Sequence, residues 1–150
     1  MEIKTKLLYL DVKNTNGRIY TQKCALKMME QFNAYVHNTG ALLGELGYPE
    51  KFEITLSNVS HQVKSLHLDL DKNYLEGTIE ILEETPNGQK VLRALGWTTE
   101  KFDDLFAVSP RGSGIVEETG EIDYESYKLY TFDIIPKDQD AFKNVEDKLK

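Results

Sequence analysis

Two stretches of alternating apolar and polar residues, both within residues 52–82, constrain the fold of this chain more than any other feature. Alternation places every second side chain on one face of a β-strand, whereas a helix repeats about every 3.6 residues. Asp71, Lys72 and Asn73 separate the two stretches and are typical of a turn. The pattern therefore predicts a β-hairpin and an antiparallel sheet. Its apolar positions are Val63, Leu66, Leu68 and Leu70 in the first strand and Leu75, Ile79 and Ile81 in the second.

Three helices are predicted from capping residues and from apolar residues three and four positions apart. Thr21 can cap a long helix whose apolar face covers the sheet. Thr85, followed by a proline, is typical of the start of a shorter helix that ends at Gly96. Asp138 can cap a final helix, which we expect over residues 137–150, docked on the domain or on a neighbour.

Further apolar runs predict more strands, the last of them rich in aromatic and β-branched residues. They cover residues 6–12, 105–108, 115–116 and 127–135. With 150 residues, 40% of them hydrophobic, the chain is long enough for one continuous core, and no repeat or Gly/Ser-rich linker divides it. We therefore expect one α+β domain over residues 1–150, with an antiparallel core.

Charge and cysteine content argue against several classes of ligand and cofactor. A net charge of −7 and a pI near 5.0 argue against nucleic-acid binding, because phosphate contacts need clustered Lys and Arg. A single cysteine, Cys24, cannot form an internal disulfide, and no Cys/His spacing suits a metal, so we expect neither metal nor cofactor. The apolar run at residues 7–10 is too short for a signal peptide or a membrane span, which predicts a protein that is cytosolic where it is made.

Residues 108–112, Val-Ser-Pro-Arg-Gly, place a serine where an apolar run ends. A serine protease needs such a hydroxyl nucleophile, a base within hydrogen-bond reach and donors for the oxyanion. Ser109 is the candidate nucleophile, while His37 and His67 are expected to have no special role. Taken alone the segment is weak evidence, because a serine beside Pro-Arg-Gly is most often a turn residue.

Several short motifs follow one another in the order seen in a known family. Residues 14–20 (NTNGRIY) are similar to its Asn-x-Asn-Gly-Arg-x-Tyr motif, and residues 41–46 (ALLGEL) to its Gly-Glu-Leu segment. Residues 56–61 (LSNVSH), 85–88 (TPNG) and 108–112 (VSPRG) are similar to its Val-Ser-His, Thr-Pro-x-Gly and Val-Ser-Ser-Arg-Gly motifs. Over residues 8–135 the chain thus resembles the prohead proteases of tailed phages, the capsid-maturation enzymes related to herpesvirus assemblins.

The resemblance implies a barrel-like, mainly antiparallel β-sheet flanked by helices, with a Ser/His proteolytic site. It also implies a role in the phage procapsid, where such enzymes cut scaffold and capsid precursors. Carried over by position, the nucleophile falls on Ser109, while the general base falls on Tyr48, where the family has histidine. The retained residues that we expect to support the site are Gly44, Glu45, Arg111 and Gly112.

Two departures from the family pattern predict a loss of proteolysis. The Tyr48 phenol, with an ordinary pKa of about 10, keeps its proton at neutral pH and is a poor base. Loss of the base lowers the rate of a serine protease roughly a million-fold in the best-studied example. Pro110 stands where the family has a second serine, and it has no N–H for an oxyanion or a substrate strand. We expect the architecture to survive nonetheless, with Arg111 holding the carboxylate of Glu45.

Three hypotheses remain open from the sequence. The first is a structural protein, an auxiliary or minor capsid component with an inactive prohead-protease fold. The second is an active maturation protease in which His61 acts as the base for Ser109, and the third is an unrelated α+β binding module. The first two predict phage capsid or scaffold proteins as partners and the virion capsid as the location, after synthesis in the cytoplasm of a host bacterium. The oligomeric state is left open.

Overall fold

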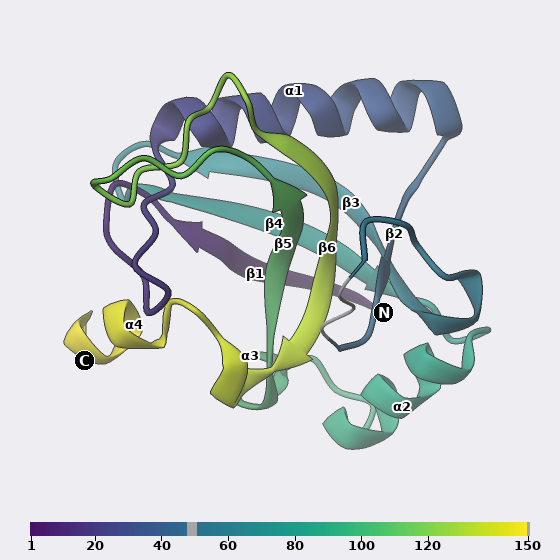
Figure 1. Ribbon diagram of the computed structural model, residues 1–150. Coiled ribbons are helices and arrows are strands. Elements are labelled where there is room, and N and C mark those ends of the chain that lie inside the picture. Colours follow the sequence, from purple (N-terminus) through teal and green to yellow (C-terminus); the bar gives the residue numbers. More distant parts are fainter. Residues whose placement is uncertain (48–50, 150) are drawn as a thin grey trace.

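The computed structural model describes residues 1–47 and 51–149, and Figure 1 shows two antiparallel β-sheets with helices around them. Short 3-10 turns at Leu56–Asn58 and Lys137–Gln139 complete the regular structure. In chain order the elements are β1 (Glu2–Tyr9), α1 (Gln22–Thr39), β2 (Leu42–Glu45), β3 (Val59–Asp69), β4 (Tyr74–Ile81), α2 (Pro86–Leu95), α3 (Phe102–Leu105), β5 (Phe106–Ser113), β6 (Lys128–Pro136) and α4 (Lys143–Leu149).

The predicted hairpin is confirmed and forms the middle of a four-stranded antiparallel sheet with the order β1-β4-β3-β2. Its turn lies at residues 70–73, one residue earlier than predicted, so Leu70 lies in the turn and is exposed instead of continuing the apolar face of the strand. Leu75, Ile79 and Ile81, which the alternation places on one face, are all buried. The strands β1 and β2 lie on the two outer sides of this hairpin.

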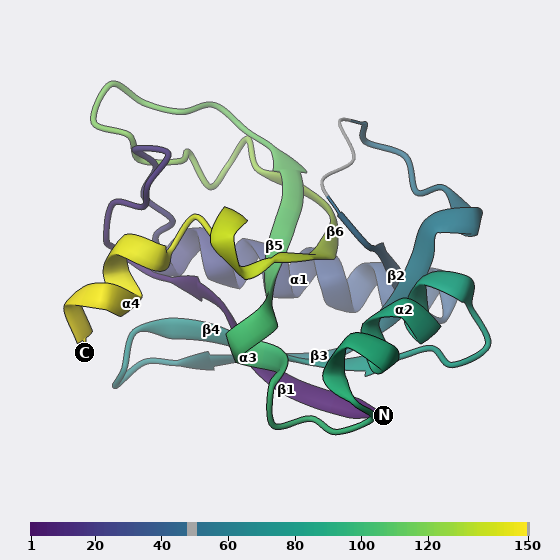
Figure 2. The same cartoon turned by 90° about the horizontal axis from the view of Figure 1, so that it is seen from below.

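A second sheet consists of β5 and β6 alone, paired antiparallel from Phe106–Pro136 to Ser113–Lys128. Figure 2 shows this hairpin rising away from the four-stranded sheet. An isolated parallel bridge, Leu46–Ile134, joins the end of β2 to β6, and the Gly47 N–H donates to the Ile134 carbonyl at 2.7 Å. The fold class is therefore α+β with antiparallel sheets.

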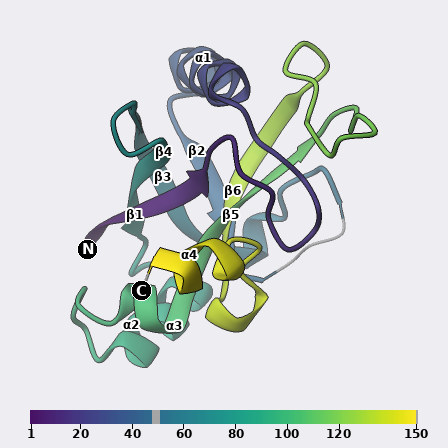
Figure 3. The same ribbon diagram turned by 90° about the vertical axis from the view of Figure 1, so that its left-hand side faces the viewer.

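The barrel-like sheet needs correction, because the described strands do not close into a barrel. The order of strands ends at β1 on one side and β5 on the other, and no backbone ladder joins those two among the described residues. Figure 3, which looks along α1, shows that helix over the opening between the two sheets.

Three strand predictions also differ from the structure. The run at residues 105–108 forms part of a longer strand, β5, which continues to Ser113. The first strand begins at Glu2 instead of residue 6, because Ile3 and Thr5 continue the buried face of β1 toward the amino terminus. The run at residues 115–116 forms only an isolated bridge between Val116 and Ile122. Its apolar side chains remain exposed, so burial does not extend it into a strand.

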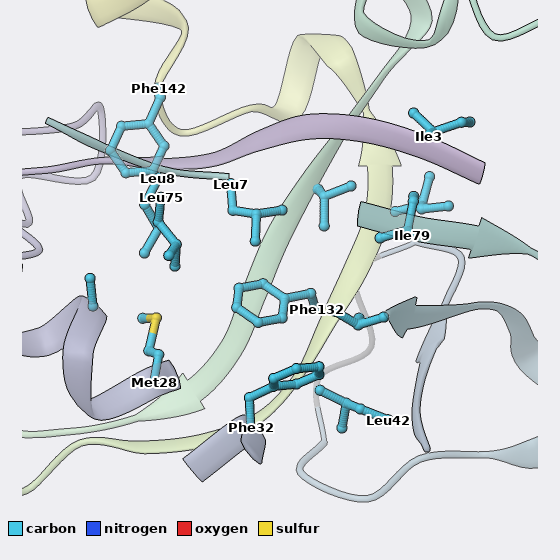
Figure 4. Close-up of a cluster of buried hydrophobic side chains, with 14 of the residues drawn as sticks. Ile3, Leu7, Leu8, Met28, Phe32, Leu42, Leu75, Ile79, Phe132 and Phe142 are labelled. Atoms are coloured by element: carbon cyan, nitrogen blue, oxygen red, sulfur yellow. The ribbon is translucent and has the colours of Figure 1, made fainter. Parts of the chain in front are cut away.

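The hydrophobic core lies between the four-stranded sheet, the β5–β6 hairpin and α1 (Figure 4). Phe132 of β6 is fully buried and points into the core, with Phe32 of α1 and Leu42 of β2 around it. Met28 fills the core beneath α1. The core thus holds the hairpin against the larger sheet.

The caps predicted for the first two helices are confirmed. The Thr21 hydroxyl accepts from the Cys24 N–H at 3.1 Å at the start of α1, and the Thr85 hydroxyl accepts from the Gly88 N–H at 2.9 Å at the start of α2. Gly96 ends α2 in the left-handed conformation, with φ of 64°. Within residues 1–47 and 51–149, no helix combines the length and the apolar character needed to cross a bilayer.

The final helix begins later than predicted. Residues 137–139 form a 3-10 turn, and α4 starts only at Lys143. Asp140, not Asp138, accepts the hydrogen bond from a backbone N–H, that of Phe142, at 3.1 Å. The Phe142 ring packs against Tyr9 at 5.9 Å between centroids, which docks this end of the chain on β1.

We expect Phe132→Ala to destabilise the protein by about 3–5 kcal/mol, because it leaves a cavity in a closely packed core. Phe52→Ala is the matched control, since that ring is 60% exposed and its loss should cost under about 1 kcal/mol. Urea unfolding followed by circular dichroism measures both values. Equal losses in the two variants would contradict the position of Phe132 at the centre of the core.

Candidate functional site

The motifs that are far apart in the sequence meet where β2, β3, β5 and β6 come together. In the β5–β6 ladder Ser109 lies opposite Asp133 and Pro110 opposite Phe132. In the β2–β3 ladder Gly44 lies opposite His61. The junction therefore carries most of the residues that the sequence singles out.

Arg111 forms a buried ion cluster with two carboxylates. Its Nε donates to Asp133 Oδ2 at 2.9 Å and its Nη2 to Asp133 Oδ1 at 2.7 Å, a bidentate pair. The same Nη2 donates to Glu45 Oε2 at 2.8 Å, so the ion pair predicted between Arg111 and Glu45 is present. All three side chains are buried. We call these three residues the Arg111 cluster.

The remaining donors of Arg111 hold the segment that follows the end of β2. Nη1 donates to the carbonyls of Lys51 at 3.3 Å and Glu53 at 2.9 Å. These bonds, with those to Asp133 and Glu45, use every N–H of the guanidinium. Glu45 Oε2 also accepts from the Thr55 N–H at 3.2 Å, so both charges of the ion pair fix this segment.

The electrostatics of the cluster are those of a desolvated structural ion group. Burial raises the pKa of Asp133 above its usual range, although the hydrogen bond from Arg111 opposes this. Burial lowers the pKa of Arg111, but the hydrogen bonds to Asp133 and Glu45 outweigh it and raise that pKa overall. Glu45 Oε1 has no hydrogen-bond partner in the described part of the chain. Loss of the cation would leave two carboxylates buried together.

His61 is fully buried and uses both of its ring nitrogens. Nε2 lies 2.8 Å from the carbonyl oxygen of Phe132, and Nδ1 lies 2.8 Å from the Ser60 hydroxyl. A carbonyl only accepts, so Nε2 carries the hydrogen, and Nδ1 of the neutral ring accepts from the Ser60 hydroxyl. Burial lowers the pKa of His61 to about 4, which keeps the ring neutral at physiological pH.

Gly44 makes room for the His61 ring between the two sheets. A Cβ at this position would overlap the imidazole of His61 and the carbonyl oxygen of Phe132. Because Gly44 has no side chain, the ring extends from β3 across β2 to the backbone of β6. A Cβ at Gly112 would likewise overlap the Tyr127 hydroxyl.

Side chains take the place of a backbone ladder between β2 and β6. The Glu45 N–H donates to Asp133 Oδ1 at 3.1 Å, and the Thr131 hydroxyl donates to the Leu43 carbonyl at 2.6 Å. The bond from His61 to Phe132 lies between them along β6. These contacts close the junction without closing a barrel.

The assignment of Ser109 and His61 as catalytic residues stays a prediction. Ser109 is half-buried on β5, and no hydrogen bond joins its hydroxyl to His61 among the described residues. Pro110, beside it on the strand, has no N–H to offer an oxyanion. Tyr48, at the position of the family's histidine, lies outside the described residues.

Three residues of the junction, Ser60, Thr131 and Asp133, were not predicted from the sequence. Ser60 lies within the Val-Ser-His motif, but no role was assigned to it. Asp133 is the lone charge within the apolar residues 129–135, and a charge placed among buried strand positions is itself a signal of an ion pair. The described residues contain no group of three or more His, Cys, Asp or Glu side chains able to hold a metal ion. His37 and His67 are exposed.

Replacement of His61 by glutamine should flatten the acid dependence of stability. The folded pKa of about 4 lies below the ordinary value of 6.5, so between these values the unfolded chain binds more protons and the unfolding free energy falls as pH is lowered. The full effect is on the order of 3 kcal/mol. Urea unfolding at several pH values between 4 and 7 measures it. His67→Gln, at an exposed strand position, should keep the wild-type slope, and an unchanged slope in His61→Gln would contradict the buried neutral ring.

Arg111→Met should destabilise the protein by about 3–5 kcal/mol, because it leaves Glu45 and Asp133 buried without their cation. Lys64→Met removes an exposed ion pair with Glu80, at 3.6 Å, and should cost under about 1 kcal/mol. Thermal and urea unfolding compare the two variants. A small loss in Arg111→Met would show that the cluster contributes no more than a surface pair.

Comparison with known proteins supports the prohead-protease-like fold that the sequence motifs predict. No protein-family model matches the sequence. Among solved structures, the capsid assembly protease gp21 of bacteriophage T4 is similar, with a TM-score of 0.70 and 18% sequence identity. The alignment covers 89% of this chain and 80% of the T4 chain. Most of this chain therefore shares the fold of a phage capsid assembly protease.

Proposed function

We propose that this chain is a phage capsid-associated structural protein, an auxiliary or minor capsid component that keeps a prohead-protease fold without its proteolysis. The observation that carries the proposal is the state of His61. Both of its nitrogens are bound, and the ring is fully buried. This supports a structural role for the one histidine that stands in a family motif.

A general base needs a free nitrogen within hydrogen-bond reach of the nucleophile. In His61 the nitrogen that carries no hydrogen already accepts from Ser60, and the other donates to Phe132. To serve Ser109, the ring would have to break two buried hydrogen bonds, which is unfavourable because the orphaned groups remain desolvated. A pKa near 4 also makes the ring a weak proton acceptor at neutral pH.

Two features of the sequence support the same conclusion. The family's base position carries Tyr48, and a phenol with its ordinary pKa is a poor base at neutral pH. Pro110 removes a backbone N–H beside the candidate nucleophile. The base and the oxyanion donors are separate requirements, so the two losses compound each other.

The partners follow from the kind of protein that shares the fold. The T4 protein is described as a capsid assembly protease. For this chain we propose capsid or scaffold proteins of its own phage as partners, and the virion capsid as its location. The likeness in fold over 89% of the chain weighs against a chance resemblance.

The alternative is that the chain is an active protease. In it Ser109 is the nucleophile of a maturation protease, and His61 turns to become its base. The fold shared with a protease, and the half-buried position of Ser109 on β5, favour this reading. It requires the hydrogen bonds of His61 to be exchanged when substrate binds.

We expect the purified chain to stay intact, alone and with the scaffold and capsid precursors of its phage, because both nitrogens of His61 are already bound. Intact-mass spectrometry over time measures cleavage of the chain and of the precursors. Ser109→Ala should behave like the wild type, and Tyr48→His should recover little activity while Pro110 remains. Ser113→Ala, on the same strand, is the matched control.

Cleavage that disappears in Ser109→Ala but persists in Ser113→Ala would establish the enzyme and overturn the structural proposal. Intact-mass spectrometry with quantification on mature particles separates the same two readings. Full-length protein at many copies supports a capsid component. Clipped fragments at trace level support a protein that acts during assembly and is then destroyed.

A further inference from the structure

A groove beside the Arg111 cluster presents apolar side chains to solvent. It has a volume of about 550 Å³ and lies between the end of α1, β2, β6 and the segment 52–56. Leu56, Phe52 and Tyr35 line it while 76%, 60% and 40% exposed. Scattered exposed apolar residues are normal, but several gathered in one hollow indicate an interaction site. The rest of its apolar lining includes Leu43, Ile54 and Tyr130.

The wall formed by residues 52–56 is fixed from its inner side. Arg111 binds the carbonyls of Lys51 and Glu53, and Glu45 accepts from the Thr55 N–H. Phe52, Glu53, Ile54 and Leu56 of this anchored segment line the groove. The ion cluster therefore holds a surface segment in one conformation, which lowers the entropic cost of binding at that surface.

An aromatic pair stiffens the groove further. The Phe52 ring stacks on Tyr130 of β6, with centroids 4.8 Å apart and an interplanar angle of 26°. Rigid, partly exposed aromatic rings are typical of positions that contribute most of the affinity in protein interfaces.

Charge limits what can occupy the groove. Glu53 is the one charged residue among the described residues of the lining, and it forms no ion pair with any of them. Lys128, the cation near Tyr130, lies 5.7 Å from that ring's centroid. A second copy of this chain would bring another net charge of −7 to the contact, whereas a basic segment is attracted.

We propose that this groove binds a short segment of a partner protein that carries apolar side chains and a lysine or arginine. The apolar side chains cover Phe52, Leu56 and Tyr35, and the basic residue meets Glu53. Ser109 does not line the groove. The proposal therefore stands whether or not the chain cuts peptides.

Selection from a displayed library of random short peptides, with the full-length protein as bait, tests this proposal. We expect the selected sequences to combine apolar residues with a lysine or arginine. A fluorescein-labelled synthetic peptide of the selected sequence then gives affinities by fluorescence anisotropy. Leu56→Ser should weaken binding about tenfold or more, because the peptide loses a buried leucine contact.

Two further variants make the test specific. Leu70→Ser changes a leucine that is 65% exposed at the distant β3–β4 turn, and its affinity should equal that of the wild type. Glu53→Lys should reverse the preference, so that it binds better a peptide whose basic residue is replaced by glutamate. All these positions are exposed, and circular dichroism checks that each variant is folded.

Three results would overturn the proposal. One is selected peptides that bind Leu56→Ser as tightly as the wild type, or that lack a basic residue. Another is the absence of any selected peptide. The last is self-association of the wild type, measured by sedimentation equilibrium and abolished in Leu56→Ser, which would assign the groove to a second copy.

Discussion

The junction of the two sheets depends on the buried guanidinium of Arg111. Its donors are shared among Glu45 of β2, Asp133 of β6 and two carbonyls of the segment 51–55. An unpaired buried charge costs several kcal/mol. Displacing any one member of the cluster is therefore unfavourable as long as the other members stay buried. One side chain thus positions the end of β2, the β5–β6 hairpin and a stretch of surface.

His61 also joins β6 to the four-stranded sheet, but by hydrogen bonds of an uncharged ring. A neutral ring placed between Ser60 and the Phe132 carbonyl links β3 to β6 without any charge, and Gly44 gives it the space to do so. Residues that resemble a protease signature therefore have a structural explanation here that involves no proteolysis. The Gly-Glu-Leu, Val-Ser-His and Val-Ser-x-Arg-Gly motifs meet at this junction, where Glu45, His61 and Arg111 make the contacts that join the sheets.

The features that the sequence predicts correctly are those that depend on residues close together along the chain. The caps at Thr21 and Thr85 and the hairpin at residues 59–81 depend on neighbours along the chain, and the structure confirms them. The open junction in place of a barrel, and the role of Asp133, depend on contacts between residues far apart in sequence. Asp133 pairs with Arg111, 22 positions away, and with the Glu45 N–H, 88 positions away, so neither propensity nor periodicity reveals the partner. The Arg111–Glu45 pair was predictable only because two motifs named its members.

A catalytic base and a structural joint make opposite demands on a histidine. A base needs an accessible nitrogen and a pKa near the working pH, whereas a joint needs both nitrogens bound and a ring that stays neutral. The burial of His61 and its lowered pKa satisfy the second set of demands. Arg111 needs no catalysis to be useful either, because its bonds to Lys51 and Glu53 hold the wall that carries Phe52. The interactions that would support a protease site thus suffice to build a rigid face for binding, and a chain that binds without cutting has the same reason to keep them.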